Sequence, residues 1–370
     1  MKKINFISAW NKNRKFTWSG INYGLFMSLQ KHFVVNDIDI SVVNRGFYYR
    51  LKKKIKKICH LNFEDLHIEH TRLATKYVNK INTDSNIYFQ FAEVKWDNAE
   101  KNIKTYIFQD QSVDQLAYMA HHQQEMFKMC NYRNVPIRMI DKRKTIQNAY
   151  YKNCAGVFTL ARWIAEDLIV RTGLPKEKVH YAGSGVNVAV EKIDYSKKEG
   201  NKICFVGRDF LRKGGFVVVD AFKELKKKMP NAELYVAGPT TNPIVDIIPG
   251  YHFLGPQNSE QLSELYNICD IFAMPSYFEA FGIVFVEALT YGLPCIGRNR
   301  QDMPSIIDHG KTGFVIEDDN PQTLANYYYE LLTDSKYSEK VRAQKDWYIK
   351  EYSWDNVADR IAEIINAENP

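Results

Sequence analysis

The sequence predicts an α/β protein of two domains, each built around a parallel sheet. Its 370 residues exceed the size of one ordinary hydrophobic core. Short apolar runs rich in β-branched residues alternate with helical patterns along both halves, and this alternation indicates parallel strands that are buried on both faces. Apolar residues make up 45% of the chain and charged residues 25%, which is ordinary for a globular protein.

In the first half, the apolar runs predict strands and the segments between them predict helices. The expected strands are residues 4–8, 38–43, 87–91, 105–109, 156–160 and 178–181. The expected helices are residues 21–32, 113–129 and 162–172. Two glycines at 183 and 185, followed by a charged connector, predict that the first domain covers residues 1–185.

The second half repeats this alternation and predicts a second domain over residues 186–350. Its expected strands are residues 202–206, 233–237, 251–254, 271–274 and 294–296, and its expected helices are residues 215–228, 259–268 and 283–291. The final segment, 351–370, has Val357, Ile361, Ile364 and Ile365 at helical spacing. We expect it to form a terminal helix that packs back on the first domain.

Composition indicates a cytoplasmic protein without a metal site. The six cysteines are scattered and form no C-x-x-C pair, which is typical of a reduced chain. The start, MKKINFISAW, lacks the apolar core of a signal peptide, and no run approaches the ~18 apolar residues of a membrane-spanning helix. Histidine pairs at 67/70 and 121/122 have no adjacent metal-ligand pattern.

The stretch YFEAFGIVFVEAL places two carboxylates, Glu279 and Glu287, in an apolar run around Gly282. A buried carboxylate is costly unless it is paired, so both residues have partners or the stretch is a site. Phe281, Gly282 and Ile283 mark a helix N-terminus after a strand, where free N–H groups and the helix dipole favour an anion. The alternative is a core helix whose glutamate pairs with an arginine.

A second strand–loop–helix motif, GRDFLRKGG, follows the strand at 202–206. Gly207 and Arg208 begin it, and Lys213 precedes the two glycines that open the next helix. An arginine can bind two phosphate oxygens, and a lysine acts as a point charge. The motif is neither a Walker loop nor G-x-G-x-x-G. It predicts a phosphate site, and the alternative is a solvated turn.

Together the two motifs resemble the retaining family-4 glycosyltransferases of GT-B fold, in which two Rossmann-like domains face each other across a cleft. Gly-Arg-x4-Lys-Gly is followed about seventy residues later by Glu-x7-Glu with Phe-Gly inside it. The resemblance is close over residues 181–334 and covers the whole chain in outline. It implies a metal-independent transfer of a sugar from a nucleotide-diphosphate sugar, with the first domain binding the acceptor and the second the donor.

The resemblance also implies roles for individual residues. Arg208 and Lys213 neutralise the leaving diphosphate, Glu279 holds the donor sugar, and Glu287 accepts hydrogen bonds from ribose hydroxyls. Asp110, after the strand at 105–109, lies where many members carry a polar residue near the acceptor hydroxyl; a helix cap or surface carboxylate is the alternative. The implied donor-binding residues are Gly20, Gly207, Arg208, Lys213, Leu254, Glu279, Phe281, Gly282, Ile283 and Glu287, and the implied catalytic residues are Arg208, Lys213, Glu279 and Asp110.

The formal net charge is +7, and a run of basic residues from Arg50 to Lys57 contributes to it. Leu51 and Ile55 lie at helical spacing among its cations, a pattern that suits an anionic membrane surface. A solvated surface helix is the alternative. No nucleic-acid motif accompanies the run, so we expect no nucleic-acid partner. A lipid-linked or glycan acceptor of bacterial cell-surface polysaccharide or lipopolysaccharide synthesis fits this pattern; a non-catalytic binder of sugar nucleotides or polyanions is the competing function.

Overall fold

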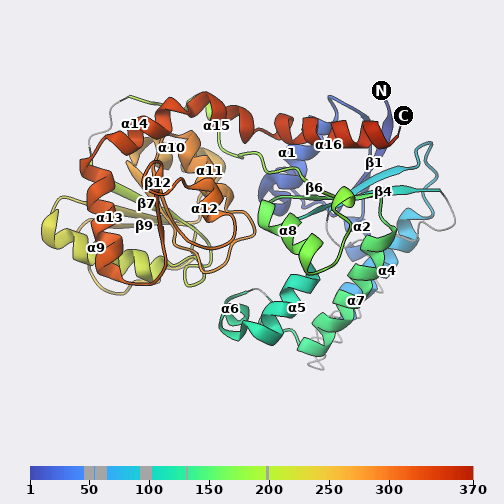
Figure 1. Ribbon diagram of the computed structural model, residues 1–370, viewed down its shortest axis with the longest axis horizontal. Coiled ribbons are helices and arrows are strands. Elements are labelled where there is room, and N and C mark those ends of the chain that lie inside the picture. The colour runs from blue at the N-terminus through green and yellow to red at the C-terminus, as the bar shows by residue number, and fades with distance from the viewer. Residues whose placement is uncertain (46–53, 55–64, 92–101, 131, 197–199, 370) are drawn as a thin grey trace. The chain divides into compact units, whose positions relative to one another are not determined.

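A computed structural model describes the chain except for residues 46–53, 55–64, 92–101, 131, 197–199 and 370 (Figure 1). The chain divides into two compact units, Met1–Gly185 with Trp354–Pro370, and Val186–Ser353. Within the described residues, each unit holds one six-stranded parallel sheet flanked by helices. The predicted α/β class with two parallel sheets is confirmed.

The first unit has its strands in the order β2-β1-β3-β4-β5-β6. Its strands are β1 (Lys3–Ser8), β2 (Val34–Asp39), β3 (Ile87–Phe91), β4 (Lys104–Gln109), β5 (Gly156–Thr159) and β6 (Val179–Tyr181). Its helices are η1 (Arg14–Gly20), α1 (Ile21–Leu29), α2 (Ser41–Arg45), α4 (Asp65–Val78), α5 (Val113–His122), α6 (Gln124–Met129), α7 (Ile137–Asn153), α8 (Arg162–Val170), η2 (Lys176–Lys178) and α16 (Trp354–Glu368). Every residue of β3 is buried, as expected for a central strand covered on both faces.

The terminal helix α16 belongs to the first unit and packs on α1 (Figure 1). Val357, Ile361 and Ile365 are buried along one side of it, whereas Ile364 is partly exposed, which explains why this amphipathic segment folds. The indole of Trp354 lies so close to Gly24 of α1 that a Cβ there would come within 2.4 Å of the ring. Asp355 accepts hydrogen bonds from Ser28 and Lys31 at 2.8 and 2.6 Å. Gly24 in α1 therefore leaves the space that the Trp354 side chain of α16 fills.

The second unit has the strand order β12-β11-β10-β7-β8-β9. Its strands are β7 (Lys202–Val206), β8 (Glu233–Ala237), β9 (Tyr251–Gly255), β10 (Ile271–Ala273), β11 (Cys295–Arg298) and β12 (Gly313–Ile316). Its helices are η3 (Val190–Lys192), α9 (Gly215–Lys228), α10 (Ser259–Ile268), α11 (Ile283–Thr290), α12 (Met303–Ile306), α13 (Pro321–Thr333), α14 (Lys336–Ala343) and α15 (Lys345–Glu351). The chain runs outward from β7 in one direction and from β10 in the other, so the order reverses between these two neighbours.

Two sequence predictions are wrong in detail, and some elements were not predicted. The strand expected at 38–43 is β2, which lies earlier; Asp39 ends it by accepting a hydrogen bond from the backbone N–H of Ser41 at 2.8 Å, where α2 begins. The helix expected at 113–129 breaks into α5 and α6 at Gln123, whose φ and ψ of −133° and 56° are not helical. The elements that the sequence did not predict include α4, α7, α13 and β12. Buried polar residues such as Arg143 and Gln147 interrupt the apolar period that would have predicted α7.

In the described part of the chain, no helix is long and apolar enough to cross a membrane. The basic run from Arg50 to Lys57 lies outside the described residues apart from Lys54.

Candidate active site

The two sequence motifs occupy adjacent loops of the second unit. The loop of residues 207–214 joins β7 to α9, and the loop of residues 274–282 joins β10 to α11. Both loops leave the carboxyl ends of neighbouring parallel strands, at the point where the strand order reverses. Ligands of open α/β sheets bind in the crevice at such a point. The sheet topology therefore brings together two motifs that are about seventy residues apart.

Two glycines set the backbone of these loops. Gly214 precedes α9 with φ of 76°, and a Cβ on it would lie 2.5 Å from the carbonyl oxygen of Pro275. Gly282 precedes α11 with φ of 86°. Both conformations are left-handed and cost other residues free energy. Gly214 thus allows the start of α9 to approach the second loop within contact distance.

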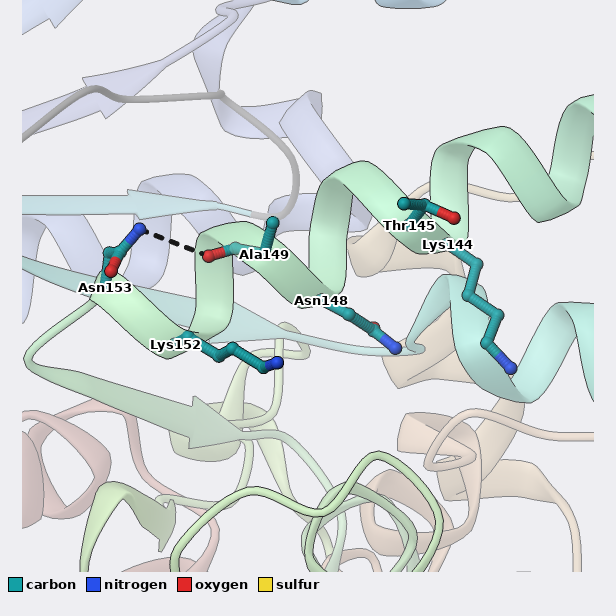
Figure 2. Close-up of a pocket in the computed structure, with 6 residues that line it drawn as sticks. All are labelled: Lys144, Thr145, Asn148, Ala149, Lys152 and Asn153. Carbon is teal, nitrogen blue, oxygen red and sulfur yellow. Dashed lines mark hydrogen bonds between the residues drawn. The ribbon is translucent and has the colours of Figure 1, made fainter.

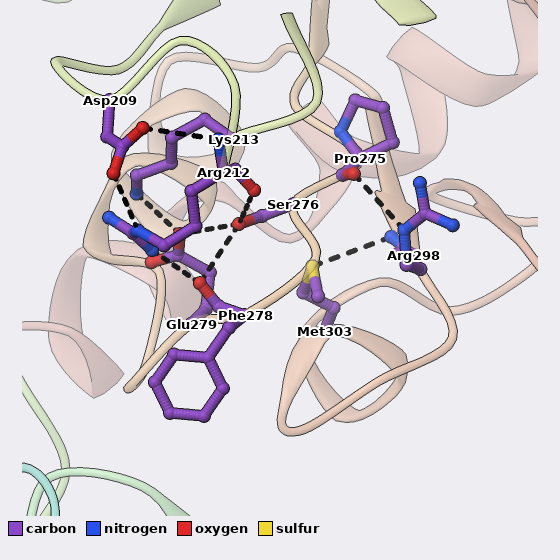
Figure 3. A network of polar contacts seen from close by, with 9 residues as sticks. All are labelled: Asp209, Arg212, Lys213, Pro275, Ser276, Phe278, Glu279, Arg298 and Met303. Atoms are coloured by element: carbon purple, nitrogen blue, oxygen red, sulfur yellow. Dashed lines mark hydrogen bonds and ion pairs between the residues drawn. The ribbon is translucent and has the colours of Figure 1, made fainter. Parts of the chain in front are cut away.

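Three donors converge on one oxygen of Glu279 (Figure 3). Its Oε1 lies 2.6 Å from Lys213 Nζ, 3.1 Å from Arg212 Nη1 and 2.9 Å from Ser276 Oγ. The carboxylate side chain is only 8% exposed. All three of these contacts are made to Oε1 rather than to the second oxygen, Oε2. One half of the carboxylate is anchored, and the other half can accept a hydrogen bond from a ligand.

The charge of Glu279 is stabilised by these cations. Burial by itself raises the pKa of this carboxyl group, but the charges of Lys213 and Arg212 outweigh burial and lower the pKa of Glu279 below its ordinary value. Glu279 is therefore ionised at neutral pH. The burial of Glu279 in the apolar stretch is thus explained, because its carboxylate is paired with two cations.

Arg298 holds the same loop from its other side. This arginine ends β11 and is 3% exposed. Its Nε donates to the carbonyl of Pro275 at 3.2 Å, its guanidinium lies 4.3 Å from the ring centroid of Tyr277, and it pairs with Asp319. The Tyr277 hydroxyl donates to the same carboxylate at 2.8 Å. These contacts fix the position of the segment that carries Glu279.

Glu287 lies inside α11, is 4% exposed and has no cationic partner among the described residues. Its Oε1 accepts from the backbone N–H of Asn187 at 3.2 Å, and its Oε2 accepts from the Tyr266 hydroxyl at 3.4 Å. Burial raises the pKa of Glu287 to about 7, and these two hydrogen bonds offset burial only in part. The two glutamates of the motif are therefore electrostatically different: one is a paired anion and the other titrates near neutrality.

The start of α11 carries the remaining predicted residues of this loop. Phe281 is buried, and its ring packs against Tyr352 at 6.4 Å between centroids. Gly282 is the N-cap, and Ile283 is the first helical residue. The first N–H groups of a helix have no intrahelical acceptor and lie at the positive end of its dipole. This end of α11 can receive an anionic group.

The other residues expected at the donor site lie at the same edge of the sheet. Arg208 is exposed, and its side chain forms no ion pair with a described residue. Gly207 is buried, and a Cβ there would lie 2.9 Å from the Lys213 side chain. Leu254, near the carboxyl end of β9, is 37% exposed. Arg208 is thus a cation available to a ligand, and Leu254 offers an apolar surface.

Two predicted residues lie in the first unit, at the carboxyl ends of its strands. Gly20, with φ of 94°, is the N-cap of α1 in the loop after β1. Ser19 before it also adopts a positive φ, 56°, so a serine holds the left-handed conformation at this position. Asp110 is partly buried and directly follows β4.

Sequence reasoning missed Arg212, Ser276 and Arg298 as partners of the site. The motif GRDFLRKGG contains both arginines, and only Arg208 was expected at the site. Arg212 and Lys213 are the two cations that contact Glu279, because they lie at the turn into α9. No local signal distinguishes Arg298, since its role depends on β11 pairing beside β10.

A cavity of about 520 Å³ lies along α7 in the first unit (Figure 2). Its described lining comes from one helix: Lys144, Thr145, Asn148, Ala149, Lys152 and Asn153. Lys144 is paired with Asp114 at 2.8 Å. Within the described ranges, no group of three or more His, Cys, Asp or Glu side chains is arranged to hold a metal ion. The cluster around Glu279 is therefore the stronger candidate site.

The segment that carries these loops matches a known protein family. Residues 190–346 match the family described as glycosyl transferases group 1. This segment contains both loops and all of the contacts around Glu279. This part of the chain therefore matches the family that its motifs resemble. The similarity of the whole chain to solved structures confirms the predicted GT-B fold.

Three similar proteins illustrate the match. D-inositol 3-phosphate glycosyltransferase from Jonesia denitrificans is 28% identical over 210 residues, 49% of this chain and 50% of the relative. The chain thus spans about half the length of this curated relative. The structure of WaaG, a glycosyltransferase involved in lipopolysaccharide biosynthesis, is 17% identical with a TM-score of 0.65 and covers 98% of this chain and 99% of WaaG. Anabaena HepE in complex with UDP-glucose is 14% identical with a TM-score of 0.63, over 99% and 100% of the two chains.

Proposed function

We propose that this protein is a retaining glycosyltransferase that moves a sugar from a nucleotide-diphosphate sugar to an acceptor hydroxyl. The observation that carries this proposal is the convergence of Lys213 and Arg212 on Glu279, at the starts of α9 and α11, where the strand order reverses. A purely structural pair would not need the adjacent glycine-opened helix N-termini. Together these groups supply positive charge and a carboxylate at a single place.

Each residue has a chemical role in this proposal. Lys213 and Arg208 neutralise the diphosphate as it leaves, which supplies the charge that a divalent metal gives in other transferases. The N–H groups of Phe281, Gly282 and Ile283 bind a phosphate oxygen. Glu279 accepts a sugar hydroxyl through Oε2. The leaving phosphate takes the proton of the acceptor hydroxyl on the same face, so no nucleophilic carboxylate is required.

The nucleoside is held by the sides of the same crevice. Glu287 accepts hydrogen bonds from the ribose hydroxyls, and Leu254 packs beside the base. A uridine nucleotide is the first donor to test, because HepE binds UDP-glucose with the same fold. In the first unit, Gly20 approaches the donor phosphate, and Asp110 interacts with the acceptor hydroxyl.

We further propose a glycan or lipid-linked acceptor at the inner face of a bacterial membrane, in the synthesis of a cell-surface polysaccharide or lipopolysaccharide. The charge distribution supports this proposal. The first unit has 31 Lys and Arg against 20 Asp and Glu, a formal net charge of +11, whereas the second unit has 19 against 23, a net charge of −4. Basic surface charge attracts anionic lipids by about 1 kcal/mol per cation.

The membrane proposal is tested with vesicles that contain anionic lipid. Changing Lys52, Lys53 and Lys56 to Glu should abolish sedimentation of the protein with these vesicles and leave its nucleotide binding intact. Neutral vesicles are the control. Undiminished sedimentation of the charge-reversed variant would end this part of the proposal.

The donor site is tested first by thermal stabilisation with UDP, GDP, ADP and CMP. A nucleotide at about 100 times its dissociation constant should add ~2.7 kcal/mol to the free energy of unfolding. Glu287→Ala should weaken its binding by about 1.5–3 kcal/mol, the scale of a charge-assisted hydrogen bond. Glu264→Ala, on an exposed residue of α10, is the matched control. If no nucleotide stabilises the wild type, the donor-site assignment fails.

The competing function is a non-catalytic binder of sugar nucleotides. The corresponding nucleotide sugar distinguishes the two functions: release of nucleoside diphosphate in the presence of acceptor supports the enzyme, and binding without any release supports the binder. The retained set of Arg208, Lys213, Glu279 and Glu287 favours the enzyme.

A further inference from the structure

The ion pairs around Glu279 place a constraint on Lys213. In the structure, the Lys213 ammonium lies 2.6 Å from Glu279 Oε1. The proposed function requires that same ammonium to contact the diphosphate. When Lys213 turns toward the phosphates, Glu279 loses its nearest cation while its side chain stays only 8% exposed. An unpaired buried carboxylate is strongly unfavourable.

The contacts of Arg212 allow it to stabilise the Glu279 carboxylate without Lys213. Its Nη1 donates to Glu279 Oε1 at 3.1 Å and also to the carbonyl of Phe278. Its own backbone carbonyl accepts from the N–H of Tyr277 at 2.9 Å. Both its side chain and its backbone are therefore tied to the loop that carries Glu279 (Figure 3).

A second carboxylate, that of Asp209, also contacts Arg212. Its Nε lies 3.5 Å from Asp209, whose carboxylate also accepts from the Arg212 backbone N–H at 3.2 Å. The planar guanidinium thus spans two carboxylates and a carbonyl in a fixed orientation. Lys213, by contrast, has a flexible stem and a single recorded ionic partner, Glu279.

We propose that Arg212 is a positioning residue that holds Glu279 in place and so releases Lys213 to the donor's diphosphate. This inference rests on the proposed function and deepens it. In the free protein both cations share Oε1 of Glu279. In the nucleotide-bound protein Lys213 moves onto the diphosphate beside Arg208, and Arg212 with Ser276 keeps Glu279 anchored, so that Oε2 continues to face the sugar.

Binding of UDP tests the proposal, because UDP has the diphosphate and lacks the sugar that Glu279 holds. Arg212→Ala should bind UDP about tenfold or more weakly, since Lys213 is then retained by Glu279. Glu279→Gln should bind UDP at least as tightly as the wild type, since its Lys213 is free. The double variant Arg212→Ala/Glu279→Gln should recover wild-type affinity, because no charge remains for Arg212 to hold.

Recovery in the double variant separates this role from a structural one. If Arg212 served only to fold the loop, the double variant would bind as weakly as Arg212→Ala. Arg212→Lys should restore part of the affinity, since it keeps the charge and loses the fixed planar geometry. Arg300→Ala, on an exposed arginine of the same unit, is the matched control and should bind UDP like the wild type. Unfolding midpoints of the free variants check that each is folded.

The outcomes distinguish this inference from the proposed function. If the wild type binds none of UDP, GDP and ADP, the proposed function fails and the inference falls with it. If the wild type binds one of them, that nucleotide replaces UDP in the experiment. Wild-type affinity in Arg212→Ala, or no recovery in the double variant, would overturn the role of Arg212 and leave the proposed function standing.

Discussion

The raised pKa of Glu287 predicts that this protein loses stability as the pH rises toward neutrality. Burial lifts the pKa of this carboxyl from its ordinary 4.5 to about 7. The folded protein then holds a proton that the unfolded chain releases. This contribution to stability is complete below about pH 4.5 and is lost as the pH rises through about 7. At about 1.4 kcal/mol per pKa unit, the loss amounts to about 3 kcal/mol.

Glu287→Gln removes the titration and keeps an acceptor oxygen for the backbone N–H of Asn187. Guanidinium unfolding should show that the variant gains about 3 kcal/mol relative to the wild type between about pH 4.5 and about pH 8. Glu264→Gln, on an exposed residue, should keep the wild-type profile. If Glu287→Gln follows the wild-type dependence on pH, the protonation argument is wrong.

The proposed ribose contact adds an expectation for binding. Ribose hydroxyls donate to the ionised carboxylate, so nucleotide binding should release a proton near neutral pH. With a pKa of about 7, affinity should rise about tenfold between about pH 6 and about pH 8. Affinity that does not change with pH would argue against Glu287 as the ribose acceptor.

The remaining predictions concern packing and catalysis. Gly214→Ala should lower the free energy of unfolding by about 1 kcal/mol because of its positive φ. The carbonyl 2.5 Å from the new Cβ should lower it by about 1–3 kcal/mol more. Gly310→Ala is the control: this glycine has nearly the same φ with nothing within 4 Å, so only the first loss is expected. In Gly24→Ala the new methyl group should overlap the indole of Trp354, and hydrogen exchange should show faster opening of α16. Unchanged protection of α16 would refute the packing described between Gly24 and Trp354. Lys213→Ala should slow sugar transfer by roughly 10²–10³ with the fold intact; a wild-type rate would remove Lys213 from the mechanism.

The sequence predicts much of the fold, because its local patterns agree with the strands and helices of the structure. The expected strands at 87–91, 202–206 and 233–237 have the same bounds as β3, β7 and β8, since an apolar run bounded by polar residues leaves little choice for a buried strand. The start of α9 was readable for the same reason, because glycines mark a turn that other residues resist. The sequence did not predict the break at Gln123 or the strand β12, because non-local packing determines both.

The sequence by itself determined the fold class and the two motif loops, because helical and strand periods and glycine positions are local properties of the chain. Only the tertiary structure decided which charges meet. The spacing of Arg208, Arg212 and Lys213 does not reveal which of them contacts Glu279; the turn into α9 directs Arg212 and Lys213 to it and leaves Arg208 exposed. The same holds for the two glutamates, which look alike in the motif: the cations beside Glu279 lower its pKa, whereas Glu287 is buried inside α11 with only hydrogen bonds and has a raised pKa.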